Sequence, residues 1–176
     1  MTLTSTRLPE VLIVQGERIP DGRGSLEVAW QQDIFKARGL DARIAQFNYV
    51  ANKTRGTIRG MHYQTAPFEQ AKLVRPIRGA VFDVAVDIRP ESPTFRQWVG
   101  VELKAGQSRM IYIPTGFAHG YQTLTDDTEI LYIVSAPYMP SHQVGLRWDD
   151  PAIGIKWQLG TPTVIHERDA SYADLV

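Results

Sequence analysis

Short extended segments, each closed by a turn signal, constrain the fold of this chain more than any other feature. In the segment 81–88, every second residue from Phe82 to Ile88 is apolar, whereas Asp83 and Asp87 share the opposite face of the strand. Similar runs, rich in β-branched and aromatic residues, occur at 98–103, 109–113 and 129–134. Regular short strands with Gly, Pro and Asp turns between them predict an all-β sandwich or barrel. A jelly roll is one way in which antiparallel chains limit exposed edges.

Helix is expected to be a minor component. The pattern predicts a short helix over 32–38, ended by Gly39, and another helical turn towards the C-terminus. The segment 149–154 is interpreted as a rigid surface turn. The 176 residues show no internal repeat, low-complexity tract or linker, so we expect a single domain over 1–176 with a sizeable core.

Charge and composition exclude several functional classes. Nineteen basic residues balance nineteen acidic ones, so the basic excess of a nucleic-acid-binding surface is absent. The chain has no cysteine, which rules out disulfides and thiolate metal sites. Neither a signal-peptide core nor a membrane-spanning apolar run is found. We therefore expect a cytoplasmic protein with no nucleic-acid or membrane partner.

The residues suited to catalysis begin in the stretch 56–64, which holds Arg59, His62 and two glycines. Lys72 and His119 follow on segments that are interpreted as neighbouring strands. A neutral histidine, with a pKa near ~6.5, can accept a proton at cellular pH, and a cation can hold the oxygen of an enolate. Taken singly, each residue also fits an ordinary strand or surface position. Together they favour an enzyme that removes a proton beside a carbonyl group.

Several sequence words resemble the nucleotide-sugar 3,5-epimerase family. They are Arg59-Gly-Met-His-Tyr-Gln64, 81–89, 92–95 and 147–154, and the resemblance extends from about residue 9 to about residue 169. The resemblance implies a cupin-type double-stranded β-helix (a jelly roll) with minor short helices. It also implies a homodimer that acts on a small-molecule nucleotide sugar without a cofactor or a metal.

The same resemblance implies catalytic roles. His62 would be the base, Lys72 would hold the enolate oxygen, and Tyr132 would deliver a proton to the opposite face of the sugar. Asp169 would orient His62, although its word 166–169 departs from the family's Ser-x-Lys-Asp at two positions. Asp83 is a second candidate partner, either for His62 or for His119.

Substrate-binding residues follow from the resemblance as well. Arginine forks suit phosphate oxygens, and three arginines are candidate diphosphate or nucleotide contacts. His142 matches nothing in the family and is interpreted as a surface residue. The binding candidates are Arg23, Gln46, Asn48, Arg59, His119, Tyr138 (stacking on the base), Gln143 (in place of a family glutamate) and Arg168.

One segment departs from the family pattern. After Arg23 and Gly24 the chain reads Ser-Leu-Glu-Val28, where the family has two aromatic residues and, at position 28, the glutamate that meets the thymine. Glu27 is adjacent, but a shift of one residue in a strand points to the other face. We therefore hypothesise that the chemistry is retained while recognition of the base or sugar is altered, towards CDP, GDP or an unusual dTDP sugar.

Three functions remain open at this stage. The leading one is epimerisation of a 4-keto-6-deoxy sugar nucleotide at C3, C5 or both. A metal-dependent cupin oxygenase or isomerase would need ligands such as His62, Glu69 and His119, but Gln64 stands where a second histidine is expected. A sugar-nucleotide-binding protein without catalysis is the third.

Overall fold

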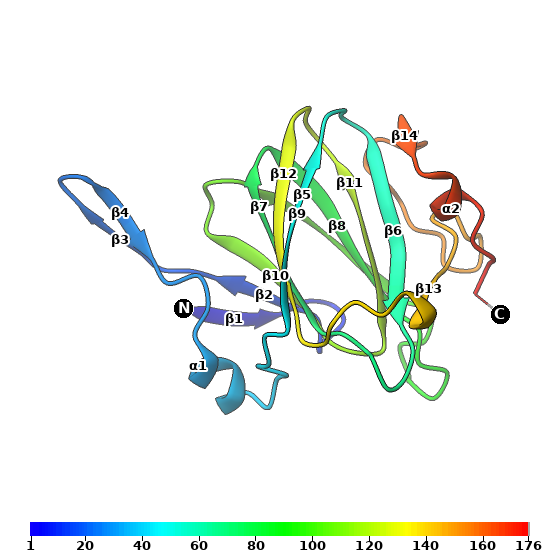
Figure 1. The fold of residues 1–176 in the computed structure, drawn as a ribbon, viewed down its shortest axis with the longest axis horizontal. Coiled ribbons are helices and arrows are strands. Elements are labelled where there is room, and N and C mark those ends of the chain that lie inside the picture. The colour runs from blue at the N-terminus through cyan, green and yellow to red at the C-terminus, as the bar shows by residue number, and fades with distance from the viewer. Residues whose placement is uncertain (176) are drawn as a thin grey trace.

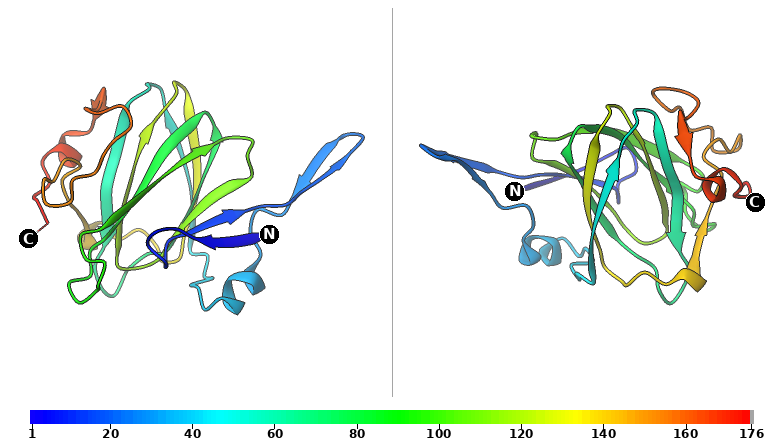
Figure 2. Two further views of the ribbon diagram at one scale, coloured as in Figure 1. Left: turned by 180° about the vertical axis from the view of Figure 1, so that it is seen from behind. Right: turned by 45° about the horizontal axis from the view of Figure 1, so that its top comes forward.

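The computed structural model describes residues 1–175, and two antiparallel sheets lie face to face in it (Figures 1 and 2). The first sheet has six strands in the order β1 (Thr2–Ser5), β2 (Leu12–Gln15), β10 (Arg109–Ile113), β7 (Lys72–Arg78), β12 (Thr128–Val134) and β5 (Gln46–Asn52). The second also has six strands. Five follow the order β13 (Gln143–Gly145), β6 (Thr57–Gln64), β11 (Phe117–Thr123), β8 (Ala80–Asp87) and β9 (Trp98–Lys104), and the sixth, β14 (Val164–Ile165), pairs with β6 in parallel.

The predicted all-β class and jelly-roll architecture are confirmed. Helix is limited to α1 (Gln32–Ala37), a 3₁₀ turn at Pro140–His142 and α2 (Glu167–Ala170). The first helix ends as expected, with Gly39 at φ +69° and the N–H of Leu40 bonded back to the carbonyl of Phe35. Within residues 1–175, no helix is both long and apolar enough to cross a membrane.

The strand β8, which lies between β11 and β9, is buried on both faces, which its alternation did not predict. Its apolar face, with Phe82 and Val84, packs outside the barrel against the covering segment that contains Ile155 and Trp157. Its other face, with Ala85 and the fully buried Asp83, points between the two sheets. The Asp83 carboxylate therefore lies inside the barrel, between the two sheets. The apolar face of β8 belongs to a second hydrophobic core on the outside of the barrel.

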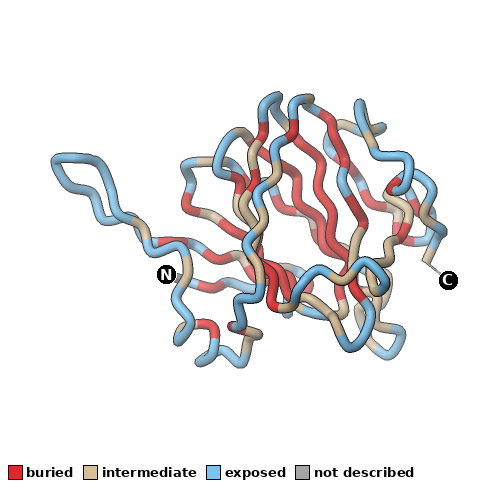
Figure 3. Tube along the Cα trace, in the orientation of Figure 1, coloured by how far each residue is buried: buried red, intermediate tan, exposed pale blue. Residues whose placement is uncertain are grey.

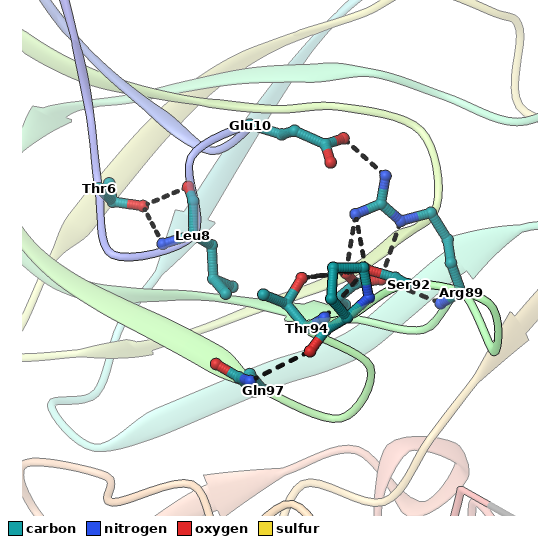
Figure 4. Close-up of polar contacts among 9 residues, drawn as sticks. Thr6, Leu8, Glu10, Arg89, Ser92, Thr94 and Gln97 are labelled. Carbon is teal, nitrogen blue, oxygen red and sulfur yellow. Dashed lines mark hydrogen bonds and ion pairs between the residues drawn. The ribbon is translucent and has the colours of Figure 1, made fainter.

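The loop from β8 to β9 is held by a buried carboxylate. Asp87 accepts hydrogen bonds from the Arg89 guanidinium (2.7 and 2.9 Å) and from the hydroxyl of Thr94 (2.6 Å), and Ser92 also bonds to it. Arg89 also reaches Glu10 at 2.6 Å, as Figure 4 shows. These contacts hold the Asp87 pKa well below its usual range against the effect of burial. The family word at 92–95 thus has a structural role.

The hairpin of β3 (Arg18–Asp21) and β4 (Gly24–Glu27) projects away from the barrel (Figure 1). Nearly all of its residues are exposed (Figure 3). Among its apolar side chains, Leu26 is 65% and Ile19 is 54% exposed. Its base is anchored by Glu27, which binds the Arg75 guanidinium through two bonds of 2.8 and 2.9 Å and accepts a third from Ser108 at 2.8 Å. The hairpin is therefore a projecting arm with a fixed base.

The segment 149–154 forms the predicted turn but does not lie wholly at the surface. Asp150 is only 1% exposed and accepts the backbone N–H groups of Ala152 (2.7 Å) and Leu175 (2.6 Å). Ile153 is buried in the outer core. The turn therefore holds the C-terminal part of the chain against the second sheet.

Candidate active site

A β-bulge on β6 turns two functional side chains towards the same space. Gly60 and Met61 together face one residue of β11, Gly120. Strict alternation would point Arg59 and His62 to opposite faces, but the extra residue brings both to the interior, where both line one cavity. The two glycines allow this, since a Cβ at Gly60 would lie 2.5 Å from the Gly120 Cα.

His62 is paired with Asp169. Its Nε2 lies 2.8 Å from one carboxylate oxygen of Asp169, and the other oxygen accepts the Gly60 N–H at 3.1 Å. Burial opposes ionisation of Asp169, but the bonds from His62 and Gly60 outweigh it and keep its pKa below the usual range. An ionised carboxylate only accepts, so Nε2 carries the proton and Nδ1 is left as the basic nitrogen.

α2 presents Asp169 although its sequence departs from the family word. The imidazole Nδ1 of His166, which replaces the serine, accepts the backbone N–H of Arg168 at 3.1 Å and caps the helix. The Arg168 side chain reaches Asp169 at 3.4 Å and lines the cavity. The replacement of the family's serine by His166 therefore preserves the N-cap of α2.

Lys72 lies at the closed side of the cavity, where it is buried. Its Nζ donates to the backbone carbonyl of His62 at 3.1 Å. Burial lowers its pKa to about 8, and the nearby charge of Asp83 acts in the opposite direction. An ammonium at this depth stabilises developing negative charge far better than one in water.

His119 has its own carboxylate. Its Nε2 lies 2.9 and 3.1 Å from the two oxygens of Asp83, on the neighbouring strand. The question of which histidine Asp83 orients is thereby answered: it pairs with His119, and Asp169 pairs with His62.

Tyr132 lies on β12, in the sheet opposite that of His62, and lines the same cavity. Burial raises its pKa, although Arg59 opposes the shift. A phenol of raised pKa stays protonated and can donate a proton. The His62 imidazole and the Tyr132 phenol thus come from opposite sheets.

The cavity has a volume of about 360 Å³. It gathers all the predicted site residues except Asp169, which lies behind His62, and Arg23. The Gln46 side chain donates to the Asn48 side-chain oxygen at 2.6 Å and accepts the Tyr138 N–H at 3.2 Å, so hydrogen bonds link these three cavity residues. The predicted residues that line it are Gln46, Asn48, Arg59, His62, Lys72, His119, Tyr132, Tyr138, Gln143 and Arg168.

Arg23 is not brought to the cavity of its own chain. It lies at the tip of the projecting hairpin, its side chain is 92% exposed, and it pairs with Asp21 at 2.7 Å. Glu27, the neighbour of Val28, is also committed elsewhere, to Arg75 and Ser108. No free carboxylate on β4 thus replaces the missing one at position 28.

The residues proposed for a metal-dependent cupin do not form one ligand set, because His62 and His119 line the cavity whereas Glu69 does not. In the part of the chain that the structure describes, no group of three or more His, Asp or Glu side chains is placed to hold a metal ion. The amide of Gln64 is fully used, since it donates to the carbonyls of Phe68 and Pro137 and accepts the Met139 N–H at 2.7 Å. Gln64 therefore braces a loop. His142 lies next to it, half-buried against Phe68.

Sequence reasoning missed three residues near the cavity. Tyr121 follows His119 by two positions on β11, and that spacing alone places it on the same face. Asn52 accepts the Arg59 Nε–H at 2.8 Å and the Tyr121 hydroxyl at 3.3 Å. Tyr172 packs edge-on against His62, with 5.9 Å between ring centroids. No local pattern marks Asn52 or Tyr172.

The fold and the site define a class: a cupin-type β-barrel whose cavity is lined by a histidine paired with a carboxylate, a tyrosine on the opposite sheet, a buried lysine and two arginines. Residues 5–176 match the family model described as dTDP-4-dehydrorhamnose 3,5-epimerase. The chain belongs to this family of sugar-nucleotide isomerases.

Individual relatives support the assignment. The dTDP-4-dehydrorhamnose 3,5-epimerase of Sinorhizobium fredii is 43% identical over 175 residues, which cover 99% of this chain and 90% of the relative. A crystal structure of the Legionella pneumophila enzyme in complex with dTDP-4-keto-L-rhamnose superposes with a TM-score of 0.93 at 35% identity, covering 99% of this chain and 92% of that one. A 3′-monoepimerase from Streptomyces bikiniensis in complex with dTDP-quinovose gives a TM-score of 0.89 at 30% identity, with 97% and 86% covered.

Proposed function

We propose that this protein epimerises a dTDP-linked 4-keto-6-deoxy sugar at C3 and C5, converting dTDP-4-dehydro-6-deoxyglucose to dTDP-4-dehydro-L-rhamnose, without a cofactor. The observation that carries the proposal is the placement of His62, paired with Asp169, and Tyr132 on opposite sheets of one cavity, which the buried Lys72 also lines. This arrangement offers a base on one face of a bound sugar and an acid on the other.

The mechanism follows from these positions. Nδ1 of His62 removes the proton next to the ketone, and Asp169 stabilises the resulting imidazolium. The electron pair moves onto the ketone oxygen, and the Lys72 ammonium stabilises the enolate. Tyr132 then gives its proton to the opposite face of the same carbon, which inverts the centre. Solvent then takes the extra proton from His62 and returns a proton to the Tyr132 phenolate, so that the same steps can invert the second carbon.

The binding residues divide between the sugar and the nucleotide. His119, held by Asp83, is positioned to hydrogen-bond the sugar. Arg59 and Arg168 at the mouth suit the diphosphate, and Tyr138, 47% exposed, offers a ring for the base. Gln46, Asn48 and Gln143 supply further hydrogen bonds.

The test is proton NMR of the protein in D₂O with dTDP-4-keto-6-deoxyglucose. Deuterium should enter at C3 and C5, and a His62→Ala variant should incorporate none. Label at one carbon only would make the protein a monoepimerase, as its likeness to the Streptomyces bikiniensis enzyme allows. A protein that binds the nucleotide sugar and exchanges no proton would contradict the proposal.

Val28 gives a reason to compare nucleotides in the same assay. No carboxylate of β4 is free to bind a base, because Glu27 is held by Arg75 and Ser108. The alternative is therefore the same chemistry on a CDP- or GDP-linked keto sugar. Exchange rates measured with the three nucleotide sugars would separate the two, since a preference for dTDP by tenfold or so would discard the alternative.

We further propose that the protein is a homodimer in which the hairpin of one subunit reaches the cavity of the other. Arg23 lies away from its own cavity, and Leu26 on the same hairpin is exposed. The outer face of the first sheet is also apolar at its edge, where Phe47 is 57% and Tyr49 58% exposed. Both surfaces are suited to burial against a second copy.

Mixing two inactive variants tests the exchange. In a mixed dimer of Arg23→Ala and His62→Ala subunits, one cavity would contain His62 together with the Arg23 of the other subunit. Activity should therefore reappear on mixing and refolding the two. If each cavity used its own Arg23, the mixture would stay as inactive as its components.

We place the protein in the cytoplasm, where a chain without disulfides is expected.

A further inference from the structure

Tyr172 is an aromatic residue beside the base that the proposed mechanism does not use. Its ring meets the His62 imidazole edge to face, with centroids 5.9 Å apart and planes at 80°. It also covers Gly145, the residue of β13 that lies opposite His62 in the sheet, because a Cβ there would lie 2.3 Å from the Tyr172 ring. The ring therefore fills the space that a side chain at position 145 would otherwise occupy.

The segment 171–175, here called the strap, is anchored at several points. The carbonyl of Ala173 accepts the Arg147 N–H at 3.1 Å, and the N–H of Leu175 donates to the buried Asp150 at 2.6 Å. The carbonyl of Leu175 accepts from Arg96 at 3.2 Å. These anchors come from the loop 92–97, which follows the word at 92–95 with Arg96, and from the word 147–154.

Arg96 shows that the anchoring has a cost. Its backbone lies at φ +64°, which is unfavourable for a residue with a side chain, and its Nε is buried with no hydrogen-bond partner among residues 1–175. The same side chain reaches the strap. Strain of this kind persists only where the surrounding structure determines it.

We propose that Tyr172 is a positioning residue for the base: its ring, held by the strap, fixes the plane of the His62 imidazole against Asp169 and closes its outer side to water. The proposal rests on the function proposed for His62. It assigns the loops 92–97 and 147–154 a shared task, which is to hold the strap and thereby the histidine.

The charges around His62 determine the expected effect of removing the ring. Burial lowers the pKa of His62, the hydrogen bond and charge of Asp169 act in the opposite direction, and Lys72 and Arg168 add to the lowering. His119 faces it across the sheet on β11. Loss of the Tyr172 ring would admit water, reduce the effect of burial and raise the His62 pKa above that of the wild type.

NMR titration of histidine ring signals measures this without substrate. The wild type, Tyr172→Phe and Tyr172→Ala would be compared, with the His62 signal identified by its absence from a His62→Asn variant. We expect a higher His62 pKa in Tyr172→Ala and restoration of the wild-type value in Tyr172→Phe, which keeps the ring. Equal values in all three proteins would overturn the proposal, whether or not the sugar nucleotide is the substrate.

Gly145→Ala provides an independent route to the same displacement. The new methyl group would push the Tyr172 ring away while leaving the tyrosine in the chain. It should raise the His62 pKa in the wild-type background and change nothing further in Tyr172→Ala, so that the two substitutions are not additive. Additive shifts would mean that Gly145 acts without Tyr172.

Kinetics then separate positioning from binding. Tyr172→Ala should lower kcat about tenfold with little change in KM, because the base is misplaced while the substrate contacts remain. The acidic limb of the kcat/KM profile should move to higher pH, since the base must be neutral to act. An unchanged kcat and limb in an active, folded variant would contradict the proposal, whereas an inactive wild type would contradict only the proposed function.

Discussion

Two histidine–aspartate pairs stand on neighbouring strands of the same sheet, and they are built differently. His62 and His119 lie opposite each other in the register of β6 and β11, and each has a carboxylate within 2.9 Å of its Nε2. Asp83 comes from the adjacent strand β8, so the His119 pair is formed inside the sheet. Asp169 comes from α2, 107 residues along the chain from His62.

The difference separates a pair fixed by the barrel from one that depends on docking. The His119 pair is buried in the barrel wall, and it forms as soon as the sheet does. The His62 pair forms only when α2 lies against β6, and the imidazole keeps 22% of its surface exposed. Local opening of α2 would therefore remove the proposed base and leave the barrel intact.

The largest expected effect comes from replacing His62, the histidine whose carboxylate partner lies on α2. His62→Asn should lower kcat by about 10³-fold or more, because the variant has no positioned base to remove the proton next to the ketone. His119→Asn should act mainly on KM, by about tenfold, because its proposed role is a hydrogen bond to the sugar. Steady-state kinetics on both variants check the contrast, and equal losses of kcat would break it.

The second-largest loss of kcat is expected from neutralising Asp169, the carboxylate on α2. Asp169→Asn keeps the shape of the side chain but removes the charge that stabilises the imidazolium and fixes the proton on Nε2. We expect kcat to fall about 10²-fold with an unchanged thermal midpoint for the barrel. A variant that melts much earlier would show that Asp169 is needed for folding as well.

The bulge between the two histidines offers a third test. At Gly120, a Cβ would lie 2.6 Å from the Met61 sulfur and 2.9 Å from the Arg59 carbonyl oxygen. Gly120→Ala should therefore destabilise the fold by about 2 kcal/mol and reduce activity, since β6 and β11 must move apart. Denaturant unfolding measures the first effect. Gly22→Ala is the matched control, since nothing lies within 4 Å of a Cβ there.

The smallest effect is expected from replacing Asp83, the carboxylate on β8, which acts on the pKa of Lys72. Lys72 must be charged to hold the enolate, so activity should fall as pH rises through its pKa of about 8. Asp83 raises that pKa, so Asp83→Asn should move the alkaline limb to lower pH. The pH profile of kcat/KM measures the shift. A limb that stays in place would mean that another group sets it.

Much of the barrel could be predicted from local pattern. The strands at 98–103, 109–113 and 129–134 and the helix ended by Gly39 agree with the structure to within a residue or two. Alternation placed Phe82 and Asp83 on opposite faces of β8 correctly. It could not say which face is interior, because that depends on the segment around Trp157 that covers the sheet from outside.

The candidate site was harder to predict, because its residues meet through tertiary contacts. The bulge at Gly60 breaks the alternation that would have separated Arg59 from His62. Asp169 was identified from the family word alone, since no spacing rule links α2 to β6. Arg23 was expected among the cavity residues and lies on the projecting hairpin. The position of Arg23 depends on the direction in which the whole hairpin projects, and the local sequence pattern does not predict that direction.

The anchored base of that hairpin has a consequence for association. A flexible arm loses conformational entropy when a partner captures it, and that loss weakens binding. Here Glu27 fixes the direction of the arm before any encounter, through Arg75 and Ser108. A surface that receives the hairpin thus meets a preorganised strand pair, and more of the apolar contact made by Leu26 and Ile19 remains as binding free energy.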